Sequence, residues 1–292
     1  MPKCKFYIVD VFAERKYEGN QLAVFICEND LSDSEMQKIA KEMNYSETTF
    51  ITSPKNYDVR IFTPEVELPF AGHPTIGTAF VIQQEIVKGN VKTMLLNLKI
   101  GPIPVLFKYK SGNPDIIWME QNPPTFGRFF DTELVTQILN LKEKDIDARF
   151  PIQEVSTGGY FMIVPLRTLD ALKRVKVNVD KCLDLMDKIE SKSILVFCPE
   201  ARIKGNNLSV RVFAHYHGIP EDPATGSGNG CLAAYLVKHK YFIKNRIDIR
   251  VEQGHEVGRP SLLYLRSEEN DSGQISVSVG GKVFFSAKGE LV

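Results

Sequence analysis

Two stretches of the chain are apolar on every face over the length of a short helix. The first covers residues 76–82 and the second covers residues 231–237, and neither contains the polar stripe of a surface helix. A helix that is apolar all round is buried all round. Because strand-like segments surround both stretches, the pattern predicts two curved sheets, each rolled around one central helix.

Each apolar stretch closes a diverged copy of one longer segment. Both copies begin with a Val-Arg-x-Phe strand, at residues 59–62 and 210–213, and run through a polar loop and a glycine into the helix. Four residues recur with a constant shift of 154 positions: Glu67, Pro69, Gly72 and Ala79 reappear as Glu221, Pro223, Gly226 and Ala233. The repeat indicates a duplication and predicts one active cleft between two similar domains.

The N-terminus is the part of each predicted helix that a ligand can reach. Helix N-termini carry unpaired N–H groups and the positive end of the helix dipole. Gly72 and His73 open the first helix, and Gly226 and Ser227 open the second, where Ser227 is the expected N-cap. Two such ends facing one cleft predict a site for a small anion, most simply a carboxylate.

The remaining pattern predicts an α+β protein. Ser32 and Glu35 form a capping box that starts a helix reaching about Asn44. Further helices are expected near 131–139 and within 168–189. The predicted strands are 5–12, 22–26, 48–51, 57–62, 93–99, 103–109, 115–120, 152–157, 160–165, 193–198 and 208–213, followed by a hairpin of 276–279 and 282–286. Strands grouped around single helices favour α+β over a parallel α/β sheet.

A proline-rich stretch divides the two halves. Residues 122–131, which begin Asn122-Pro123-Pro124, have the composition of a linker. We therefore expect one domain over 1–121 and another over 122–292, with the option that the last strand returns to the first domain.

Composition removes several classes of partner. The 292 residues carry 36 basic and 36 acidic side chains, so there is no electrostatic argument for a nucleic-acid or membrane-surface partner. The longest apolar runs are too short to span a membrane, and the N-terminus has no apolar signal-peptide block. We expect a cytoplasmic protein.

The cysteines do not suggest redox or metal chemistry. Five are present, at positions 4, 27, 182, 198 and 231, without close pairing and without a C-x-x-C motif. The expectation is reduced and mostly buried thiols.

Three polar residues are candidates for the chemistry. Glu47 lies between a predicted helix end and a strand, a position where a carboxylate is usually a solvated side chain. Asp222 lies in a loop before the second helix, where a turn or capping role is the simpler reading. His73 offers an imidazole able to hydrogen-bond when neutral and to transfer protons near neutral pH.

Two further motifs are set aside. His215 and His217 could offer imidazoles to a metal, but no third ligand stands at a diagnostic spacing, so we expect no metal. Gly226-x-Gly228-x-Gly230 lacks both the Lys-Ser/Thr of a P-loop and the spacing of a dinucleotide-binding motif, so we expect no nucleotide.

Taken in order, four strings and the opening of the chain resemble the phenazine-biosynthesis PhzF-like isomerase family. The resemblance spans essentially the whole chain, and the fourth of its motifs is highly specific. The motifs are Val9-Asp10-Val11-Phe12 with Gly19-Asn20, Ser46-Glu47-Thr48, Gly72-His73-Pro74-Thr75, Glu221-Asp222-Pro223-Ala224-Thr225-Gly226-Ser227 and Gly258-Arg259-Pro260-Ser261.

The resemblance implies the diaminopimelate epimerase fold, with two pseudo-symmetric domains and the site between them. It also implies a homodimer. Diaminopimelate epimerases and proline racemases of this fold use a cysteine pair as acid and base, whereas this chain has His73 and Ser227 at the helix starts and Cys231 a turn further on. A two-cysteine mechanism is therefore not expected.

For the chemistry, the resemblance implies that Glu47 moves a proton between carbons of a cyclic amino acid such as trans-2,3-dihydro-3-hydroxyanthranilate. The same resemblance implies a set of residues that bind the small carboxylate substrate, without metal or organic cofactor: His73, Asp222, Ser227, Gly72, Gly226 and Gly228. The alternatives are an amino-acid epimerase or racemase of the same fold and a non-catalytic small-molecule-binding protein.

Overall fold

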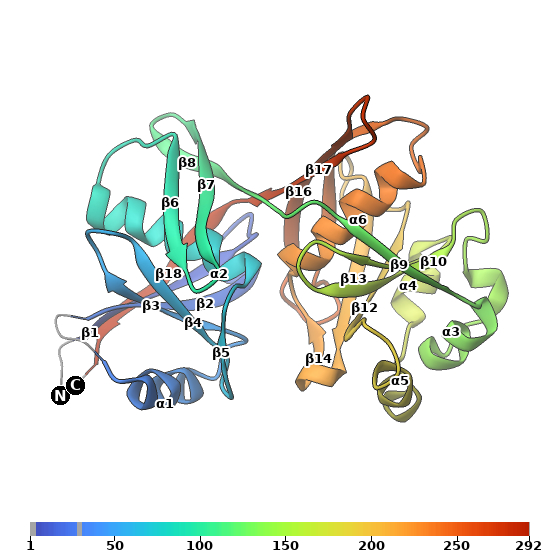
Figure 1. Ribbon diagram of the computed structural model, residues 1–292, viewed down its shortest axis with the longest axis horizontal. Helices are drawn as coiled ribbons and strands as arrows, with labels where there is room; N and C mark the ends of the chain where they lie inside the picture. Colours follow the sequence, from blue (N-terminus) through green and yellow to red (C-terminus); the bar gives the residue numbers. More distant parts are fainter. Residues whose placement is uncertain (1–3, 28–30, 292) are drawn as a thin grey trace. The chain divides into compact units, whose positions relative to one another are not determined.

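The computed structural model describes residues 4–27 and 31–291 (Figure 1). The chain divides into two compact units, one made of Met1–Met119 with Gly280–Val292 and the other of Glu120–Val279. The first unit is therefore discontinuous in sequence, because the C-terminal strand is part of it. No helix among the described residues is long and apolar enough to cross a membrane.

The first unit is a mostly antiparallel sheet with two α-helices. The neighbouring strands β18, β1, β2, β3 and β4 pair in that order, and β4 then pairs with both β5 and β6. Its strands are β1 (Cys4–Val11), β2 (Asn20–Cys27), β3 (Thr48–Ser53), β4 (Asp58–Phe62), β5 (Glu67–Leu68), β6 (Thr93–Leu98), β7 (Gly101–Lys110), β8 (Asn113–Glu120) and β18 (Val283–Glu290). Its α-helices are α1 (Asp33–Met43) and α2 (Gly72–Val81), and α2 continues into a π-helix at Ile82–Val87.

The second unit has a similar arrangement of strands, but different helices accompany its buried helix. Its strands are β9 (Thr125–Phe130), β10 (Ile152–Ser156), β11 (Tyr160–Pro165), β12 (Ser193–Cys198), β13 (Leu208–Ala214), β14 (Ile219–Asp222), β15 (Arg246–Gln253), β16 (Ser261–Glu269) and β17 (Ile275–Gly281). Its α-helices are α3 (Thr132–Leu139), α4 (Leu169–Arg174), α5 (Val179–Met186) and α6 (Gly226–Lys238). Short 3₁₀ turns occur at Glu143–Asp145 and His215–His217.

Equivalent strand pairs of the two units have the same relative direction, parallel or antiparallel. The pairs β2–β3 and β4–β6 are parallel in the first unit, as are β11–β12 and β13–β15 in the second. The pairs β1–β2, β3–β4 and β6–β7 are antiparallel, and so are β10–β11, β12–β13 and β15–β16. The predicted α+β class with two similar sheets is confirmed, and the shared topology supports the duplication inferred from the sequence.

Each unit is built around a buried helix, as predicted. All ten residues of α2 are buried, and α6 is buried except at Ser227 and Lys238. Strands β1, β2, β3, β6, β7 and β18 contact α2, while β10, β11, β15 and β16 contact α6 (Figure 1). Each buried helix begins with a glycine, Gly72 in α2 and Gly226 in α6, directly after a polar loop.

Two expectations about secondary structure are wrong. Residues 125–130 of the expected linker form β9, which pairs with β10 as β18 pairs with β1. Gly280 and Gly281 belong to β17 and do not form a hairpin turn. The helices expected within 168–189 are confirmed as α4 and α5, which are separated because the chain leaves the helix at Val175.

One pair of cysteines is oxidised, against the expectation of five free thiols. Cys4 and Cys27 are opposite one another on β1 and β2 and form a disulfide. Their separation of 23 residues carries no pairing signal, since only the antiparallel register brings them together. Cys182, Cys198 and Cys231 are free and buried.

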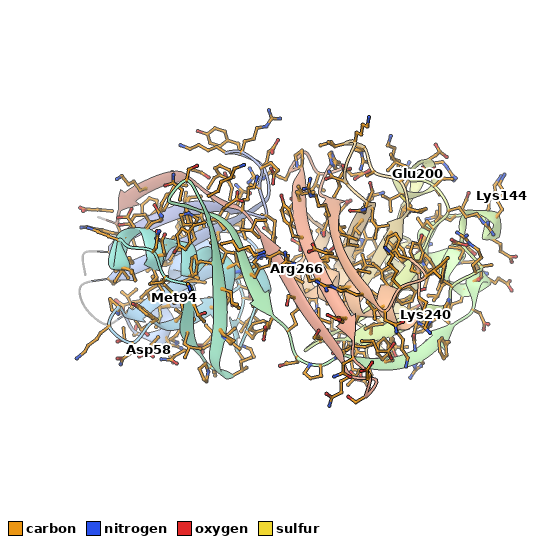
Figure 2. All side chains as sticks on the ribbon, turned by 90° about the horizontal axis from the view of Figure 1, so that it is seen from above. Asp58, Met94, Lys144, Glu200, Lys240 and Arg266 are labelled. Atoms are coloured by element: carbon orange, nitrogen blue, oxygen red, sulfur yellow. A yellow bond between two sulfur atoms is a disulfide. The ribbon has the colours of Figure 1, made fainter. Side chains whose placement is uncertain are left out.

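Charged side chains of both signs cover the surface of each unit (Figure 2). Lys144, Glu200 and Lys240 are exposed on the second unit, and Arg266 on β16 pairs with Asp248 on β15 at 3.0 Å. This mixture agrees with the balanced composition and favours no polyanionic partner.

Candidate active site

Two of the site residues expected in the first unit, Glu47 and His73, lie together. Glu47 immediately precedes β3, and His73 is the second residue of α2. The Glu47 Oε2 atom is 3.6 Å from the His73 Nε2 atom. The His73 residue is 5% exposed and the Glu47 side chain is 16% exposed, so the carboxylate is the more accessible of the two.

Local structure explains why Glu47 is held at this place. Helix α1 ends at Asn44, which adopts the left-handed conformation with φ 53° and donates its N–H to the Ala40 carbonyl. Asparagine tolerates this conformation well, and it ends a helix sharply. A short turn then leads to Thr48, which pairs with Ala23 in the parallel β2–β3 ladder. Glu47 is thus fixed between a helix cap and a buried strand.

The His73 imidazole is neutral. Burial lowers the pKa of His73 to about 3, although a hydrogen bond with the Gln21 backbone opposes the shift. The ring therefore takes up no proton near neutral pH, and the expectation that it transfers protons there is not supported. Its role as a neutral hydrogen-bonding group is compatible with these surroundings.

The environment of His73 also indicates which ring nitrogen carries the hydrogen. Nδ1 lies 3.5 Å from the Asn20 Nδ2 atom, while Nε2 is buried and has no hydrogen-bond partner among the described residues. The Asn20 amide nitrogen can only donate, so its hydrogen bond requires the lone pair on Nδ1 and assigns the ring hydrogen of the neutral imidazole to Nε2. That N–H group is on the atom nearest Glu47.

In the second unit, Asp222 is joined to the start of α6. Asp222 ends β14 and is 8% exposed. The Thr225 hydroxyl donates a hydrogen bond to the Asp222 Oδ2 atom. Thr225 is also the N-cap residue of α6, so the expectation that Ser227 caps this helix is wrong. Ser227 is the second helical residue and is half-buried.

Both helix starts keep backbone donors open. The first turn of an α-helix leaves its N–H groups without intrahelical partners, and proline at position 74 removes one that would not have been used. Within the described parts of the chain, neither N-cap residue, Ala71 nor Thr225, caps its helix through a side-chain hydrogen bond. Each start can therefore bind a small anion.

The predicted glycines are buried at these starts, and one of them lies close to a neighbouring side chain. Gly72 and Gly226 are the first residues of α2 and α6, and both are buried. A Cβ added at Gly228 would be 3.0 Å from the Phe161 ring, so that glycine lets the helix approach β11 closely.

Four residues at the two starts were missed from the sequence as site residues. Asn20 stands beside His73, and Thr225, Asn229 and Gln253 form hydrogen bonds around Asp222. Asn20 and Thr225 belong to motifs that carry the family resemblance, which was the available signal. No sequence signal marked Gln253, because it is 31 residues from Asp222.

The histidines set aside as metal ligands are in the 3₁₀ turn at His215–His217. Burial lowers the pKa of both, and the His215 ring stacks against Phe213. Among residues 4–27 and 31–291, no group of three or more His, Cys, Asp or Glu side chains is arranged to hold a metal ion. The absence of metal stays a prediction.

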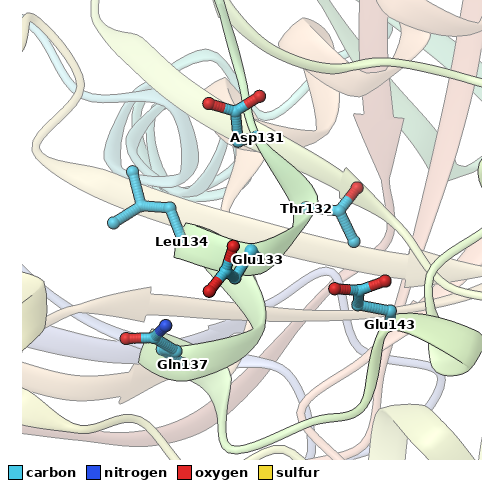
Figure 3. A pocket seen from close by; sticks show the side chains of 6 residues that line it. All are labelled: Asp131, Thr132, Glu133, Leu134, Gln137 and Glu143. Carbon is cyan, nitrogen blue, oxygen red and sulfur yellow. The ribbon is translucent and has the colours of Figure 1, made fainter.

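A surface hollow in the second unit is unrelated to these residues. It surrounds the start of α3 and is lined by Asp131, Thr132, Glu133, Leu134, Gln137 and Glu143 (Figure 3). Three carboxylates in its wall oppose the binding of an anionic substrate. None of the predicted site residues lines this hollow.

Comparison with known proteins identifies the family. The profile of the PhzC-PhzF family, described as phenazine biosynthesis-like protein, matches residues 9–289. The trans-2,3-dihydro-3-hydroxyanthranilate isomerase of Pseudomonas aeruginosa is 33% identical over 288 residues, covering 98% of each chain. An uncharacterized isomerase of Clostridium acetobutylicum is 32% identical over 303 residues, covering 99% of this chain and 98% of that one.

A solved structure agrees over the full length. The phenazine biosynthesis protein of the PhzF family from Bacillus anthracis superposes with a TM-score of 0.91 at 26% identity, covering 100% of both chains. The resemblance carried by the sequence motifs is thereby confirmed. The chain belongs to the PhzC-PhzF family of phenazine biosynthesis-like proteins.

Proposed function

We propose that the protein, an isomerase of the PhzF family, moves a proton between two carbons of a small amino-acid-like carboxylate, with Glu47 as acid and base. The observation that carries the proposal is the placement of the Glu47 carboxylate 3.6 Å from the Nε2 atom of a neutral His73. A relative covering the whole chain is named for the isomerisation of trans-2,3-dihydro-3-hydroxyanthranilate. No organic cofactor or metal is needed for such a transfer.

The proposed reaction balances without any other reactant. The Glu47 carboxylate accepts a proton from one carbon, and the C–H electron pair shifts into the conjugated system of the substrate. The protonated Glu47 then returns the proton to a second carbon, so that substrate and product are isomers. Because the Nε2 atom of His73 carries the ring hydrogen and lies 3.6 Å from Glu47, it can donate a hydrogen bond to the carboxylate before the first step and after the second.

The remaining groups are proposed to hold the substrate. Asp222 suits an ammonium or hydroxyl group, while the open N–H groups at the start of α6 and the Ser227 hydroxyl suit a carboxylate. Gly72 and Gly228 would let substrate approach the backbone at the two starts. The proposal requires that the two helix starts meet in one cleft.

The cysteine-based epimerase alternative is disfavoured by the state of the thiols. Burial raises the pKa of Cys231 to about 12 and those of Cys182 and Cys198 to about 11. A thiol must ionise to act as a base, so these three are poorly suited to that role near neutral pH. A non-catalytic binding protein is the remaining alternative, and only a turnover assay separates it.

The test uses trans-2,3-dihydro-3-hydroxyanthranilate as the first probe and compares wild type with Glu47→Gln. Glutamine keeps the size but cannot carry the proton, so binding measured by calorimetry should persist while turnover falls by about 100- to 10,000-fold. Glu42→Gln, an exposed change on α1, is the control. Near-wild-type turnover in Glu47→Gln would exclude the role and make Asp222 the next candidate.

If wild type does not convert that compound, a thermal-shift screen of cyclic and linear amino acids comes next. Binding without turnover of every ligand that stabilises the protein would favour the non-catalytic alternative.

A homodimer and a cytoplasmic location also stay predictions. Sedimentation at micromolar concentration that shows only the 33.0 kDa chain would contradict the dimer.

A further inference from the structure

Gln253, the last residue of β15, uses its whole hydrogen-bonding capacity at the start of α6. Its side chain is buried, with the residue 1% exposed. The Oε1 atom accepts from the Thr225 N–H at 3.2 Å and from the Asn229 Nδ2 atom at 2.8 Å. The Nε2 atom donates to the Asp222 carbonyl at 2.8 Å and to the Thr225 hydroxyl oxygen at 3.0 Å. A glutamine amide offers two donors and two acceptor lone pairs, and all four are engaged.

These bonds determine the direction of the Thr225 hydroxyl. The Gln253 Nε2 atom can only donate, so the Thr225 oxygen must be the acceptor in that bond. The single hydroxyl hydrogen of Thr225 is then directed to the Asp222 carboxylate, where the structure has a hydrogen bond. Gln253 therefore acts on Asp222 twice, through the backbone carbonyl and through Thr225.

The backbone next to Gln253 favours the same arrangement. Gly254 has a φ of +78°, and a Cβ there would be 2.5 Å from the Pro223 carbonyl oxygen and 2.3 Å from that of Arg259. The chain turns sharply against the residue that follows Asp222, which only glycine permits without strain. The parallel pairing of β15 with β13 brings this turn to the end of β14.

We propose that Gln253 is a positioning residue, which fixes the Asp222 carboxylate and the first turn of α6 through Thr225. This inference rests on the proposed function of Asp222 in substrate binding. It adds a residue from a distant strand to the site, and it assigns Thr225 the role of relay in place of a simple helix cap.

Gln253→Glu is the main test, because it keeps the size and the acceptors but removes both donor bonds. Gln153→Glu is the matched control. Gln153 is also a buried glutamine of the second unit, 5% exposed, with its Nε2 donating to the Gly127 carbonyl at 3.1 Å and its Oε1 2.7 Å from the His239 Nε2 atom. Both substitutions bury a carboxylate, but only the first one does so beside Asp222.

Two measurements on the substrate-free protein decide the inference without any activity. In Gln253→Glu the ¹³C′ and ¹³Cγ resonances of Asp222 should both move, because the donor bond to its carbonyl and the bond that orients the Thr225 hydroxyl are lost, whereas Gln153→Glu should change neither. Unchanged ¹³C′ and ¹³Cγ resonances in Gln253→Glu would overturn the proposal.

With a converted substrate, kcat/KM of Gln253→Glu should fall by about 10- to 100-fold relative to Gln153→Glu at comparable melting temperature. Thr225→Val, which removes the relay, should reproduce this loss, and Thr225→Ser, which keeps the hydroxyl, should restore it. Equal kcat/KM in Gln253→Glu and Gln153→Glu would overturn the proposal. If wild type converts no substrate, the proposed function fails while the two resonance measurements still test Gln253.

Discussion

At the start of α2, the buried Nε2 atom of His73 has no hydrogen-bond partner among the described residues and is 3.6 Å from Glu47. At the start of α6, every hydrogen-bonding position of the Gln253 amide is occupied. A loosely satisfied polar group can exchange partners during a reaction, whereas a saturated network holds its members in one geometry. The difference fits proton transfer in the first unit and substrate orientation in the second.

Beneath this difference, the two units keep the same scaffold. Arg60 forms a two-pronged ion pair with Glu67 at 2.8 and 3.0 Å, and Arg211 does so with Glu221 at 2.9 and 2.7 Å. Each arginine also lies over the phenylalanine two residues further along its strand, at 5.1 and 4.8 Å. These ion pairs hold the segment that leads to each helix start, so the two units share this support while the polar side chains at the two helix starts differ.

The largest expected effect comes from breaking these two ion pairs. The Arg211 side chain is 9% exposed and also donates to the Leu172 and Val175 carbonyls, whereas that of Arg60 is 28% exposed and adds only an exposed bond to Asp33. Arg211→Met should lower the free energy of unfolding by about 3–5 kcal/mol, because it leaves the Glu221 carboxylate, whose side chain is only 11% exposed, without its ion-pair partner. Arg60→Met should cost about 1 kcal/mol or less. Urea denaturation followed by circular dichroism measures both, and equal losses would contradict the comparison.

The sequence predicted the parts of this protein that local chemistry dictates. Two helices apolar on all sides could only be buried, and the recurrence of Gly72 and Gly226 after matched strands indicated the duplication. Glu47, His73 and Asp222 were found through motifs, and the structure brings Glu47 and His73 together.

What the sequence did not predict depends on partners far apart in the chain. Gln253 meets Asp222 only because β15 pairs with β13, and Cys4 meets Cys27 only through the register of β1 and β2. Ser227 has the right chemistry for an N-cap, yet the helix begins two residues earlier because Thr225 is held by Gln253.

The disulfide is an asymmetry between the units, and removing it is the next test. Cys4–Cys27 joins β1 to β2, whereas the free cysteines Cys182, Cys198 and Cys231 are all in the second unit. A cross-link that closes about 23 residues stabilises by about 3 kcal/mol. The double variant Cys4→Ser, Cys27→Ser should lose this amount, and reductant should lower wild type to the same level.

The unit that loses stability can be identified by fluorescence, because the single tryptophan, Trp118, is buried in the first unit. Its fluorescence should report an earlier unfolding transition after reduction. The double variant is the control, since reductant should leave its transition unchanged. A shift of the same size in that variant would place the effect elsewhere.

Replacing one glycine in each buried helix with alanine should distinguish a disturbance of apolar packing from a disturbance of the polar contacts at the helix start. A Cβ at Gly77 would be 2.6 Å from Leu22 Cδ2, an apolar clash, and one at Gly230 would be 1.8 Å from Gln121 Oε1. Gln121 donates to the Gly226 carbonyl, so its displacement reaches the start of α6. Each alanine should cost about 1–3 kcal/mol. Only Gly230→Ala should also raise KM, and an equal rise in Gly77→Ala would remove the distinction.

The smallest expected effect concerns the unprotonated state of His73. Its pKa is about 3 in the folded protein, compared with about 6.5 for a histidine in an unfolded chain. Below pH 6.5 the unfolded state binds a proton that the folded state does not, so stability falls as the pH falls, until both states are protonated below about pH 3. Between pH 7 and pH 6 this contribution amounts to about 0.7 kcal/mol. His73→Asn should therefore lose less stability than its parent over that interval.

The measurement should be made in a Glu47→Gln background, because Glu47 is the carboxyl group nearest the imidazole. Urea denaturation at pH 7.0, 6.5 and 6.0 then gives a slope for the parent and a flatter slope for the added His73→Asn. His239, whose pKa burial also lowers, contributes equally to both proteins and cancels in the difference. Parallel slopes would mean that His73 is accessible to protons in the folded state, and the contrast between the neutral, under-bonded His73 side chain and the fully bonded Gln253 amide would be lost.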